Sequence, residues 1–290
     1  MSTAFLGLGN MGGPMAANLV KAGEEVTGYD PSPEARAAAS AAGVSVVDNA
    51  VAAVAGAGVV ITMLPSGGHV LELYRELVPA AGPGTLFLDC STIEVADARA
   101  AAGLATGHGH LALDAPVSGG VVGAGAATLT FMAGGPAEAF AAAEPHLKHM
   151  GAKLVHCGET GAGQAAKICN NLILGVSMIA VSEAFALGRG LGLTDQALFD
   201  VASTASGQCW ALTTNCPVPG PVPASPANRD YRGGFASGLM LKDLRLAQAA
   251  AQAEGVRTAL GDHAERLYTE FVEQDGPGRD FSAIITGITG

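Results

Sequence analysis

The sequence predicts a two-domain α/β chain, in which a doubly wound, mostly parallel sheet comes first and an all-helical domain follows. Two observations carry this prediction. Strand-like and helix-like patterns alternate up to about residue 160, which is typical of a parallel sheet covered on both faces. After residue 163 only helical patterns follow. We therefore expect domains over residues 1–162 and 163–290, with the boundary inside residues 158–163.

The elements expected in the first domain are short apolar strands separated by alanine-rich helices. The expected strands are 3–6, 25–30, 44–47, 58–64, 85–90, 111–116, 128–133 and 153–157. Helices are expected at 15–21, 50–57 and 136–150, among others. In the second domain they are expected at 164–189, 195–202, 239–254, 261–274 and 282–288. The proline-rich segment 217–226 is interpreted as an ordered loop or a lid, because helices resume after it.

Composition and charge narrow the class of protein. With 49% apolar and 14% charged residues over 290 positions, the chain is globular rather than disordered. The net charge of −11 argues against nucleic acid or an anionic membrane as a partner. Five cysteines without a C-x-x-C spacing indicate reduced thiols in a cytosol-like compartment. The longest apolar run, 172–181, is too short to span a bilayer, and the first strand begins at once, so we expect a cytoplasmic protein without a signal or transit peptide.

A glycine-rich turn joins the first expected strand to the first expected helix. Gly7, Gly9 and Gly12 form the pattern G-x-G-x-x-G in a strand–turn–helix setting. The first glycine permits a tight turn, the second lets a pyrophosphate approach the backbone, and the third lets the helix pack on the sheet. The pattern therefore predicts a Rossmann-type domain. The residues expected to contact the dinucleotide here are Gly7, Leu8, Gly9, Asn10, Met11 and Gly12.

Asp30 indicates which dinucleotide is bound. It ends the second expected strand, 21 residues after Gly9, where a carboxylate accepts hydrogen bonds from the hydroxyls of an adenosine ribose. The next three residues are uncharged, so no cation directly follows to meet a 2′-phosphate. We therefore predict NAD as the preferred cofactor. Arg36 lies near enough in sequence to leave NADP open.

A lysine and an asparagine lie near the start of the long helix expected after residue 163. Lys167 and Asn171 share one helical face, and they follow three glycines that allow another backbone or a ligand to approach. An ammonium beside a carboxamide suits a proton donor or acceptor with a partner that holds a substrate hydroxyl. The alternative is a surface lysine in the first turn of a core helix.

Several segments together resemble the β-hydroxyacid dehydrogenases. They are residues 7–16, 114–120, 129–132, 163–171, 206–210, 217–220 and 240–244. The resemblance extends over nearly the whole chain, and its motifs occur in the order that one active site requires. It implies a homodimer or homotetramer that oxidises a 3-hydroxy acid with NAD. The substrate it implies first is 3-hydroxyisobutyrate, which would become methylmalonate semialdehyde in valine catabolism.

The resemblance also assigns roles to individual residues. It implies Lys167 and Asn171 as the catalytic pair, with Lys167 exchanging the proton of the substrate hydroxyl. The residues implied to bind the substrate are Ser118, Gly119, Gly120, Thr92, Trp210, Phe235 and Asp243. Those implied to contact the cofactor outside the glycine turn are Leu64, Pro65, Thr92 and Lys242. A serine followed by two glycines would take the substrate carboxylate through hydroxyl and backbone N–H groups.

Other interpretations stand beside these roles. Residues 118–120 alone fit a strand-to-loop turn, Lys242 with Asp243 fits an exposed helical pair, and Trp210 fits the helical core. Four histidines suggest a metal, but they lack a third ligand of suitable spacing, so no metal site is expected. They are His108, His110, His146 and His149. Arg229 and Cys216 depart from the family pattern at positions expected to border the pocket.

Two further functions remain open from the sequence. One is reduction of a small semialdehyde, such as tartronate or succinate semialdehyde, by the same residues in reverse. The other belongs to a different class, a non-catalytic NAD-binding module that recognises a partner through its helical domain. The intact Lys167 and Asn171 argue against the second.

Overall fold

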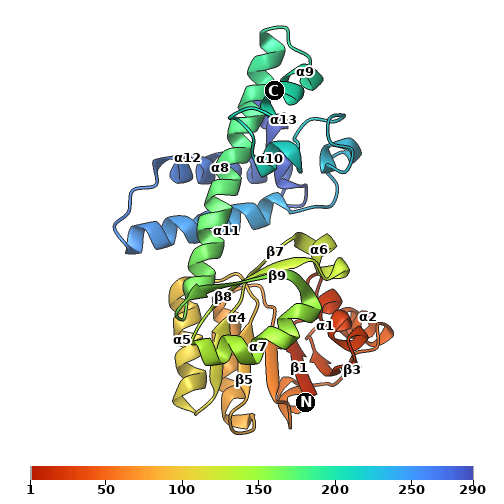
Figure 1. The fold of residues 1–290 in the computed structure, drawn as a ribbon, viewed down its shortest axis with the longest axis vertical. Coiled ribbons are helices and arrows are strands. Elements are labelled where there is room, and N and C mark those ends of the chain that lie inside the picture. Colours follow the sequence, from red (N-terminus) through yellow and green to blue (C-terminus); the bar gives the residue numbers. More distant parts are fainter. Residues whose placement is uncertain (1, 290) are drawn as a thin grey trace. The chain divides into compact units, whose positions relative to one another are not determined.

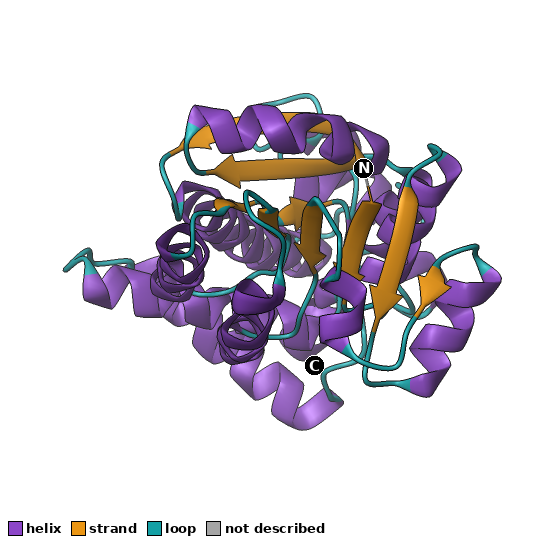
Figure 2. Cartoon of the chain, turned by 90° about the horizontal axis from the view of Figure 1, so that it is seen from below, coloured by secondary structure: helices purple, strands orange, loops and turns teal. Residues whose placement is uncertain are grey.

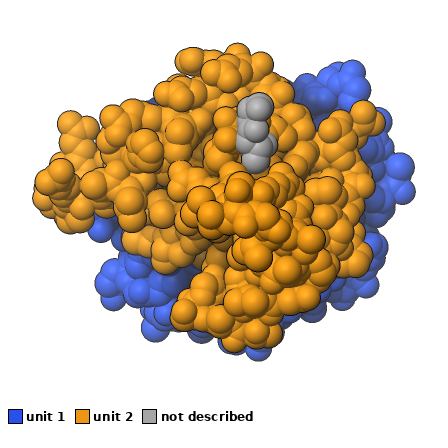
Figure 3. Space-filling view, turned by 90° about the horizontal axis from the view of Figure 1, so that it is seen from above, with its two compact units in different colours: residues 1–167 blue, residues 168–290 orange. Residues whose placement is uncertain are grey.

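The computed structural model describes residues 2–289. The chain divides into two compact units, the first ending at Lys167 and the second beginning at Ile168 (Figure 3). Helix α8 (Ala162–Gly190) begins in the first unit and continues in the second. The boundary expected between residues 162 and 163 falls at the start of this helix, and a domain division there stays a prediction.

Over the described residues, the first unit is built on one nine-stranded sheet (Figures 1 and 2). Its strand order is β3 (Ser45–Val46), β2 (Glu25–Tyr29), β1 (Ser2–Leu6), β4 (Val59–Thr62), β5 (Leu86–Asp89), β6 (Leu111–Asp114), β8 (Leu129–Gly134) and β7 (Val117–Ser118), with β9 (Gly151–Gly158) paired to β8. Neighbours from β3 to β6 are parallel, and β8 is antiparallel to β6 and β7. The doubly wound, mostly parallel sheet is therefore confirmed. Strand β7 was not expected, because its two residues directly follow the expected strand 111–116 and are followed by two glycines.

The strands bury side chains on both faces of this sheet. In β1, Phe5 belongs to one hydrophobic cluster, whereas Ala4 and Leu6 belong to another. The first cluster includes residues of α1 (Gly12–Lys21), α2 (Pro33–Ala41), α6 (Gly120–Ala126) and α7 (Ala137–Met150). The second includes residues of α3 (Ala50–Val54), α4 (Gly67–Leu77), the 3₁₀ turn η1 (Val78–Ala80) and α5 (Val95–Gly107). Because both faces are covered, the central strands β1, β4, β5 and β6 are buried along almost their whole length and appear in the sequence as largely apolar runs.

Local capping signals start some of the helices. Ser32 accepts a hydrogen bond from the N–H of Ala35 at 3.2 Å, and Pro33 occupies the first position of α2. Thr194 caps α9 (Asp195–Ala202) in the same way. Helix α8 is different, because the residue before it is Gly161, which has no side chain to cap it. Its first turn must be fixed from elsewhere in the chain.

The second unit is built from helices. Besides α8 and α9 they are α10 (Trp210–Thr213), α11 (Ser237–Ala253), α12 (Ala259–Asp275), α13 (Ile285–Thr289) and the 3₁₀ helices η2 (Pro226–Arg229) and η3 (Phe281–Ile284). Tyr268 and Phe281 are fully buried in its core, and the Tyr268 hydroxyl donates to the Phe281 carbonyl at 3.0 Å. The all-helical C-terminal domain predicted from the sequence is confirmed.

The proline-rich segment before α11 is ordered by side-chain bonds to its backbone. The Ser225 hydroxyl donates to the Cys216 carbonyl at 2.6 Å, and the Tyr231 hydroxyl donates to the Pro217 carbonyl at 2.9 Å. These bonds close the segment on itself, so the interpretation as an ordered loop holds.

Helix α8 contains the apolar run 172–181 and is much longer than it. With 29 residues, the whole helix is long and apolar enough to cross a membrane by length and composition, which the run considered alone is not. About two fifths of its most apolar stretch, 44%, is buried inside the protein. The core helix of a protein that never enters a membrane passes the same test, so this is weak evidence for a membrane span.

Candidate active site

The glycine turn between β1 and α1 contains two glycines that the fold itself requires. Gly7 has a φ of +92°, and a Cβ there would collide with the carbonyl oxygen of Met63. A Cβ on Gly12 would collide with the carbonyl oxygen of Gly7. Gly9 is different, since a Cβ there would meet no atom within 4 Å. Packing within the chain therefore does not require a glycine at this exposed position.

Asp30 holds the glycine turn through its carboxylate. One oxygen accepts from the backbone N–H of Leu8 at 2.8 Å, and the other accepts from the N–H of Ser32 at 2.8 Å. Each carboxylate oxygen has a second lone pair, so Asp30 can still accept from a ribose hydroxyl. The Arg36 guanidinium donates to the carbonyl oxygens of Asp30 and Pro31, at 2.6 and 3.3 Å. Arg36 is thus engaged by the loop that carries Asp30.

The loops after β4 and β5 are tied together by a buried serine. The Ser91 hydroxyl accepts from the backbone N–H of Leu64 at 2.8 Å and donates to Asp89 at 2.6 Å. The hydroxyl of Thr62 donates to the same oxygen of Asp89 at 2.7 Å. The predicted cofactor residues 64 and 65 are therefore linked to the residue that directly precedes Thr92.

Residues 118–120 form a turn between β7 and α6. Ser118 pairs with Thr130 of β8, while Gly119 and Gly120 have φ values of +131° and +61°, which strain any other residue. Ser118 and Gly120 are half-buried, and Gly119 is exposed. A Cβ on Gly120 would meet no atom within 4 Å. The space beside Gly120 is therefore open.

Lys167 is buried in the first unit, with only 6% of its surface exposed. The alternative of a surface lysine is therefore wrong. Of the three glycines before it, Gly163 allows a close backbone approach. A Cβ there would run into the Met132 carbonyl and lie 2.7 Å from an Asp114 carboxylate oxygen. The Asp114 carboxylate accepts from the N–H groups of Gly161 at 2.6 Å and Gln164 at 2.9 Å.

In the second unit, a polar group joins α8 to α11. The Asn171 side-chain amide donates to Asp243 at 2.5 Å, and Asn170 donates to the Asn171 amide oxygen at 2.9 Å. The Lys242 ammonium lies 3.8 Å from the other Asp243 oxygen. Asn171 and Asp243 are 1% and 4% exposed, so the alternative of an exposed pair at residues 242 and 243 is wrong for Asp243.

Phe235 and Trp210 lie in other parts of the second unit. The Phe235 N–H donates to Asp280 at 2.8 Å, and its ring packs edge-on against Phe281 with centroids 5.8 Å apart. Trp210 begins α10 and is 52% exposed. The alternative that places Trp210 in the helical core is therefore wrong.

Cys216 and Arg229, which depart from the family pattern, both contact parts of the second unit. Cys216 is fully buried in the core of the second unit, and burial raises the pKa of its thiol to about 11. The Arg229 guanidinium donates to the carbonyl oxygens of Arg232 at 2.8 Å and Ala224 at 3.1 Å. Both residues therefore shape the ordered segment before α11.

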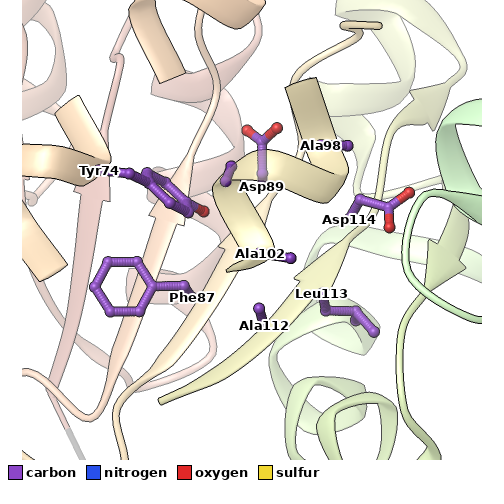
Figure 4. Close-up of a pocket in the computed structure, with 9 residues that line it drawn as sticks. Tyr74, Phe87, Asp89, Ala98, Ala102, Ala112, Leu113 and Asp114 are labelled. Carbon is purple, nitrogen blue, oxygen red and sulfur yellow. The ribbon is translucent and has the colours of Figure 1, made fainter. Parts of the chain in front are cut away.

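Two buried aspartates end neighbouring strands of the sheet. Asp89 closes β5 and Asp114 closes β6, and the two are partners in the parallel register. Both line a small cavity together with Tyr74 (Figure 4). Burial raises the pKa of both carboxyls, that of Asp114 to about 6, although the N–H groups of Gly161 and Gln164 oppose the rise.

Four hydrogen-bonded residues at this edge of the sheet had no predicted role. They are Asp89, Ser91, Asp114 and Gln164. The carboxyl ends of parallel strands meet at one edge of a sheet, where ligands bind. Two successive expected strands that each contain an aspartate near that end were the signal that could have found the first and third. Gln164 carried no such signal, because its bonds reach residues far away in sequence.

The first unit fits a dinucleotide. Gly9 is open, and Asp30 lies at the carboxyl end of β2 while contacting the glycine turn. A backbone turn at a helix N-terminus beside a carboxylate matches the pyrophosphate and the ribose of such a cofactor.

Comparisons with known proteins agree with this arrangement. A family model described as the NAD-binding domain of 6-phosphogluconate dehydrogenase matches residues 2–158. A second, described as NAD-binding of NADP-dependent 3-hydroxyisobutyrate dehydrogenase, matches residues 161–288. Together the two models account for nearly the whole chain.

Relatives match over almost their full length. The chain is 56% identical over 282 residues to a probable 3-hydroxyisobutyrate dehydrogenase of Mycobacterium tuberculosis, covering 97% of this chain and 96% of the relative. It is 48% identical over 284 residues to an NAD-dependent L-serine dehydrogenase of Pseudomonas aeruginosa, covering 97% and 95%. The solved structure of the M. tuberculosis 3-hydroxyisobutyrate dehydrogenase with L-serine superposes with a TM-score of 0.97 at 55% identity, covering 100% and 99%. The chain therefore belongs to the β-hydroxyacid dehydrogenase family and is an NAD-dependent oxidoreductase of 3-hydroxy acids.

Proposed function

We propose that the protein oxidises 3-hydroxyisobutyrate to methylmalonate semialdehyde with NAD. The observation that carries this proposal is the buried lysine, Lys167, on the helix that also carries Asn171. The substrate is taken from the relative that is 56% identical over 282 residues.

The proposed chemistry divides among the chain's own residues. Lys167 takes the proton of the substrate hydroxyl, and Asn171, held by Asp243, orients that hydroxyl. Ser118, with the N–H groups of the two glycines after it, binds the substrate carboxylate. NAD, when bound, supplies the hydride acceptor.

The proposed cofactor contacts are assigned residue by residue. The pyrophosphate is bound by residues 7–12, which include Gly9. The adenosine ribose is bound by Asp30. Residues 64, 65, 92 and 242 are proposed at the nicotinamide end. Thr92, Trp210 and Phe235 are proposed to contact the substrate as well.

L-Serine is a second candidate substrate. It carries the same carboxylate and 3-hydroxyl group, with an ammonium where 3-hydroxyisobutyrate has a methyl group. A relative named NAD-dependent L-serine dehydrogenase is 48% identical over 284 residues, and the solved structure at 55% identity contains L-serine. The semialdehyde reductase and the non-catalytic module have no comparable support.

A substrate panel tests the proposal. Purified full-length protein is assayed for NADH formation with 3-hydroxyisobutyrate, L-serine and unbranched 3-hydroxy acids. We expect kcat/KM for 3-hydroxyisobutyrate to exceed that for L-serine by about tenfold or more, because taking the ammonium of L-serine out of water without a charged partner costs free energy. A larger kcat/KM for L-serine would transfer the assignment to serine. No NADH with any acid would reject both.

We propose a cytoplasmic homodimer or homotetramer that acts in valine catabolism. Large apolar side chains remain exposed on the second unit, which is typical of a surface covered by another subunit. They are Ile173, Leu187, Leu191, Val201 and Leu260. Light scattering coupled to size exclusion should show a mass that is a multiple of 28.7 kDa. A monomer at micromolar concentration would contradict the assembly.

A further inference from the structure

The start of α8 lacks the side chain that usually caps a helix. The carbonyl of Gly161 accepts the first intrahelical bond, from the N–H of Ala165 at 3.0 Å, so Gly161 is the N-cap residue. With a φ of +90° and no side chain, Gly161 cannot itself cap the helix. The N–H of Ala162 donates to the Glu159 carbonyl at 2.9 Å, whereas the N–H groups of Gly161 and Gln164 donate to a residue far away in sequence. Lys167 lies within the two turns that follow.

Asp114, far away in sequence, takes the place of that cap. Its two carboxylate oxygens separately accept from the N–H of Gly161 at 2.6 Å and the N–H of Gln164 at 2.9 Å. These positions are the N-cap and the third residue of the helix, the second of which a capping side chain ordinarily serves. A negative charge here also interacts favourably with the helix dipole.

Two glycines make room for this contact. A Cβ on Gly134 would lie 2.7 Å from one Asp114 carboxylate oxygen, and a Cβ on Gly163 would lie 2.7 Å from the other. Any side chain at either position would push the carboxylate away from the helix. The sequence around Asp114 is thus arranged for its close approach to α8.

Gln164 connects the same helical turn to the loop after β5. Its side-chain nitrogen donates to the Ser91 carbonyl at 2.7 Å, and its side-chain oxygen accepts from the N–H of Ile93 at 3.1 Å. These two bonds lie on either side of Thr92. The first turn of α8 is therefore fixed to the end of β6 and to the 91–93 loop at once.

We propose that Asp114 is a positioning residue for Lys167. It fixes the first turn of α8, and that turn sets where the lysine ammonium stands. The proposal rests on the proposed function of Lys167 as the group that exchanges a proton with the substrate. A displacement of about 1 Å in a reacting group can slow a reaction substantially, which is why one remote carboxylate can matter for turnover.

A double-mutant cycle in the full-length protein tests this. Asp114→Asn keeps the size of the side chain but replaces one acceptor oxygen by a donor. We expect kcat to fall about tenfold with the Kd for NAD within twofold of the unmodified protein. In a Lys167→Ala background the same change should lower kcat less than twofold, because no lysine remains to be positioned. An unchanged kcat, or an equal fall in both backgrounds, overturns the proposal.

Thr194→Ala is the matched control. It removes a cap from α9, where the threonine hydroxyl accepts from the N–H of Ala197 at 3.2 Å, and it should leave kcat unchanged. If Asp114→Asn does not fold, Gln164→Met carries the same cycle, because it removes both bonds that tie the turn to Ser91 and Ile93.

A readout without substrate separates this proposal from the proposed function. Amide hydrogen exchange at Gly161 and Gln164 should accelerate at least tenfold in Asp114→Asn. If the unmodified protein oxidises none of the acids, the proposed function fails while faster exchange still supports the fixed helix start. Unchanged exchange overturns the positioning role whatever the enzyme oxidises.

Discussion

The nucleotide loop, residues 7–12, and the start of α8, residues 161–167, are held in place by different means. The nucleotide loop depends on its own glycines, with Gly7 at a positive φ and Gly12 in contact with the carbonyl of Gly7. The start of α8 depends on Asp114 and on bonds from Gln164 to Ser91 and Ile93. The first is fixed by local backbone geometry, the second by side chains from distant strands.

This difference predicts how each region fails. Changes in the nucleotide loop should alter cofactor binding, since its backbone is proposed to contact the pyrophosphate and it carries no group that exchanges a proton. Changes at the start of α8 should alter turnover, since this segment carries the proposed base. The predictions below follow from this separation.

The largest effect is expected from Lys167→Ala. Removing the side chain should lower kcat by roughly 10²-fold or more while NAD still binds, because general acid–base catalysis contributes on that order. Asn171→Ala should also slow turnover, though less. Steady-state kinetics and a direct NAD titration measure the two properties separately. Near-normal turnover in Lys167→Ala would mean that another group moves the proton.

A smaller effect is expected when the substrate loses its charge. The turn at residues 118–120 is proposed to act through backbone N–H groups, as the nucleotide loop does, and it should read a carboxylate. Losing a charge-assisted contact costs about 1.5–3 kcal/mol, so the amide of the substrate should show a kcat/KM lower by about ten- to a hundredfold. Comparable values for acid and amide would place the carboxylate site elsewhere.

The same difference between local and distant contacts decides which features could be predicted from the sequence. The strand–turn–helix at the N-terminus and the carboxylate of Asp30 could be predicted, because their spacing along the chain is fixed by local geometry. The capping of α8 by Asp114 could not, since Asp114 and Gly161 are 47 positions apart in the sequence and only the sheet register brings them together. Strand β7 was missed for another reason, because Val117 and Ser118 directly follow the expected strand 111–116.

Two alanine substitutions sharpen the view of the nucleotide loop. Gly9→Ala should keep the melting temperature and weaken NAD binding by roughly tenfold, because its Cβ meets only the space where a ligand approaches. Gly12→Ala should instead destabilise the protein, because its Cβ collides with the Gly7 carbonyl. Calorimetry and NAD titration of both variants provide the comparison. Equal NAD affinity in Gly9→Ala and the unmodified protein would remove the ligand explanation for Gly9.

Asp30→Ala should have a weaker effect on cofactor choice. The carboxylate repels a 2′-phosphate, so the unmodified protein should show a larger kcat/KM with NAD than with NADP. Asp30→Ala should reduce the ratio of these two values, because it removes the repulsion without producing a phosphate site. Arg36 should help little, because its guanidinium is bonded to the carbonyl oxygens of Asp30 and Pro31. The ratio of kcat/KM for the two cofactors measures the preference. Equal or better efficiency with NADP in the unmodified protein would contradict the assignment.

The smallest expected effect concerns stability at the start of α8. Burial raises the pKa of Asp114 from 3.8 to about 6, so the folded chain binds this proton more tightly than the unfolded chain. The free energy of unfolding should therefore fall as pH rises from about 4 to about 6 and then level off. Asparagine does not titrate, so the melting temperature of the unmodified protein relative to Asp114→Asn should drop by roughly a few degrees across that window.

The direction in which this melting-temperature difference changes with pH shows whether the ionised carboxylate stabilises the fold or only positions Lys167. The ionised Asp114 that fixes α8 at neutral pH is the form that burial disfavours, so the group improves turnover at some cost in stability. Calorimetry of both proteins between pH 4 and 7 measures the difference, in which most other titrating groups cancel. A difference that grows with pH would mean that the folded state lowers the pKa of Asp114, and that the carboxylate stabilises the fold where it also positions Lys167.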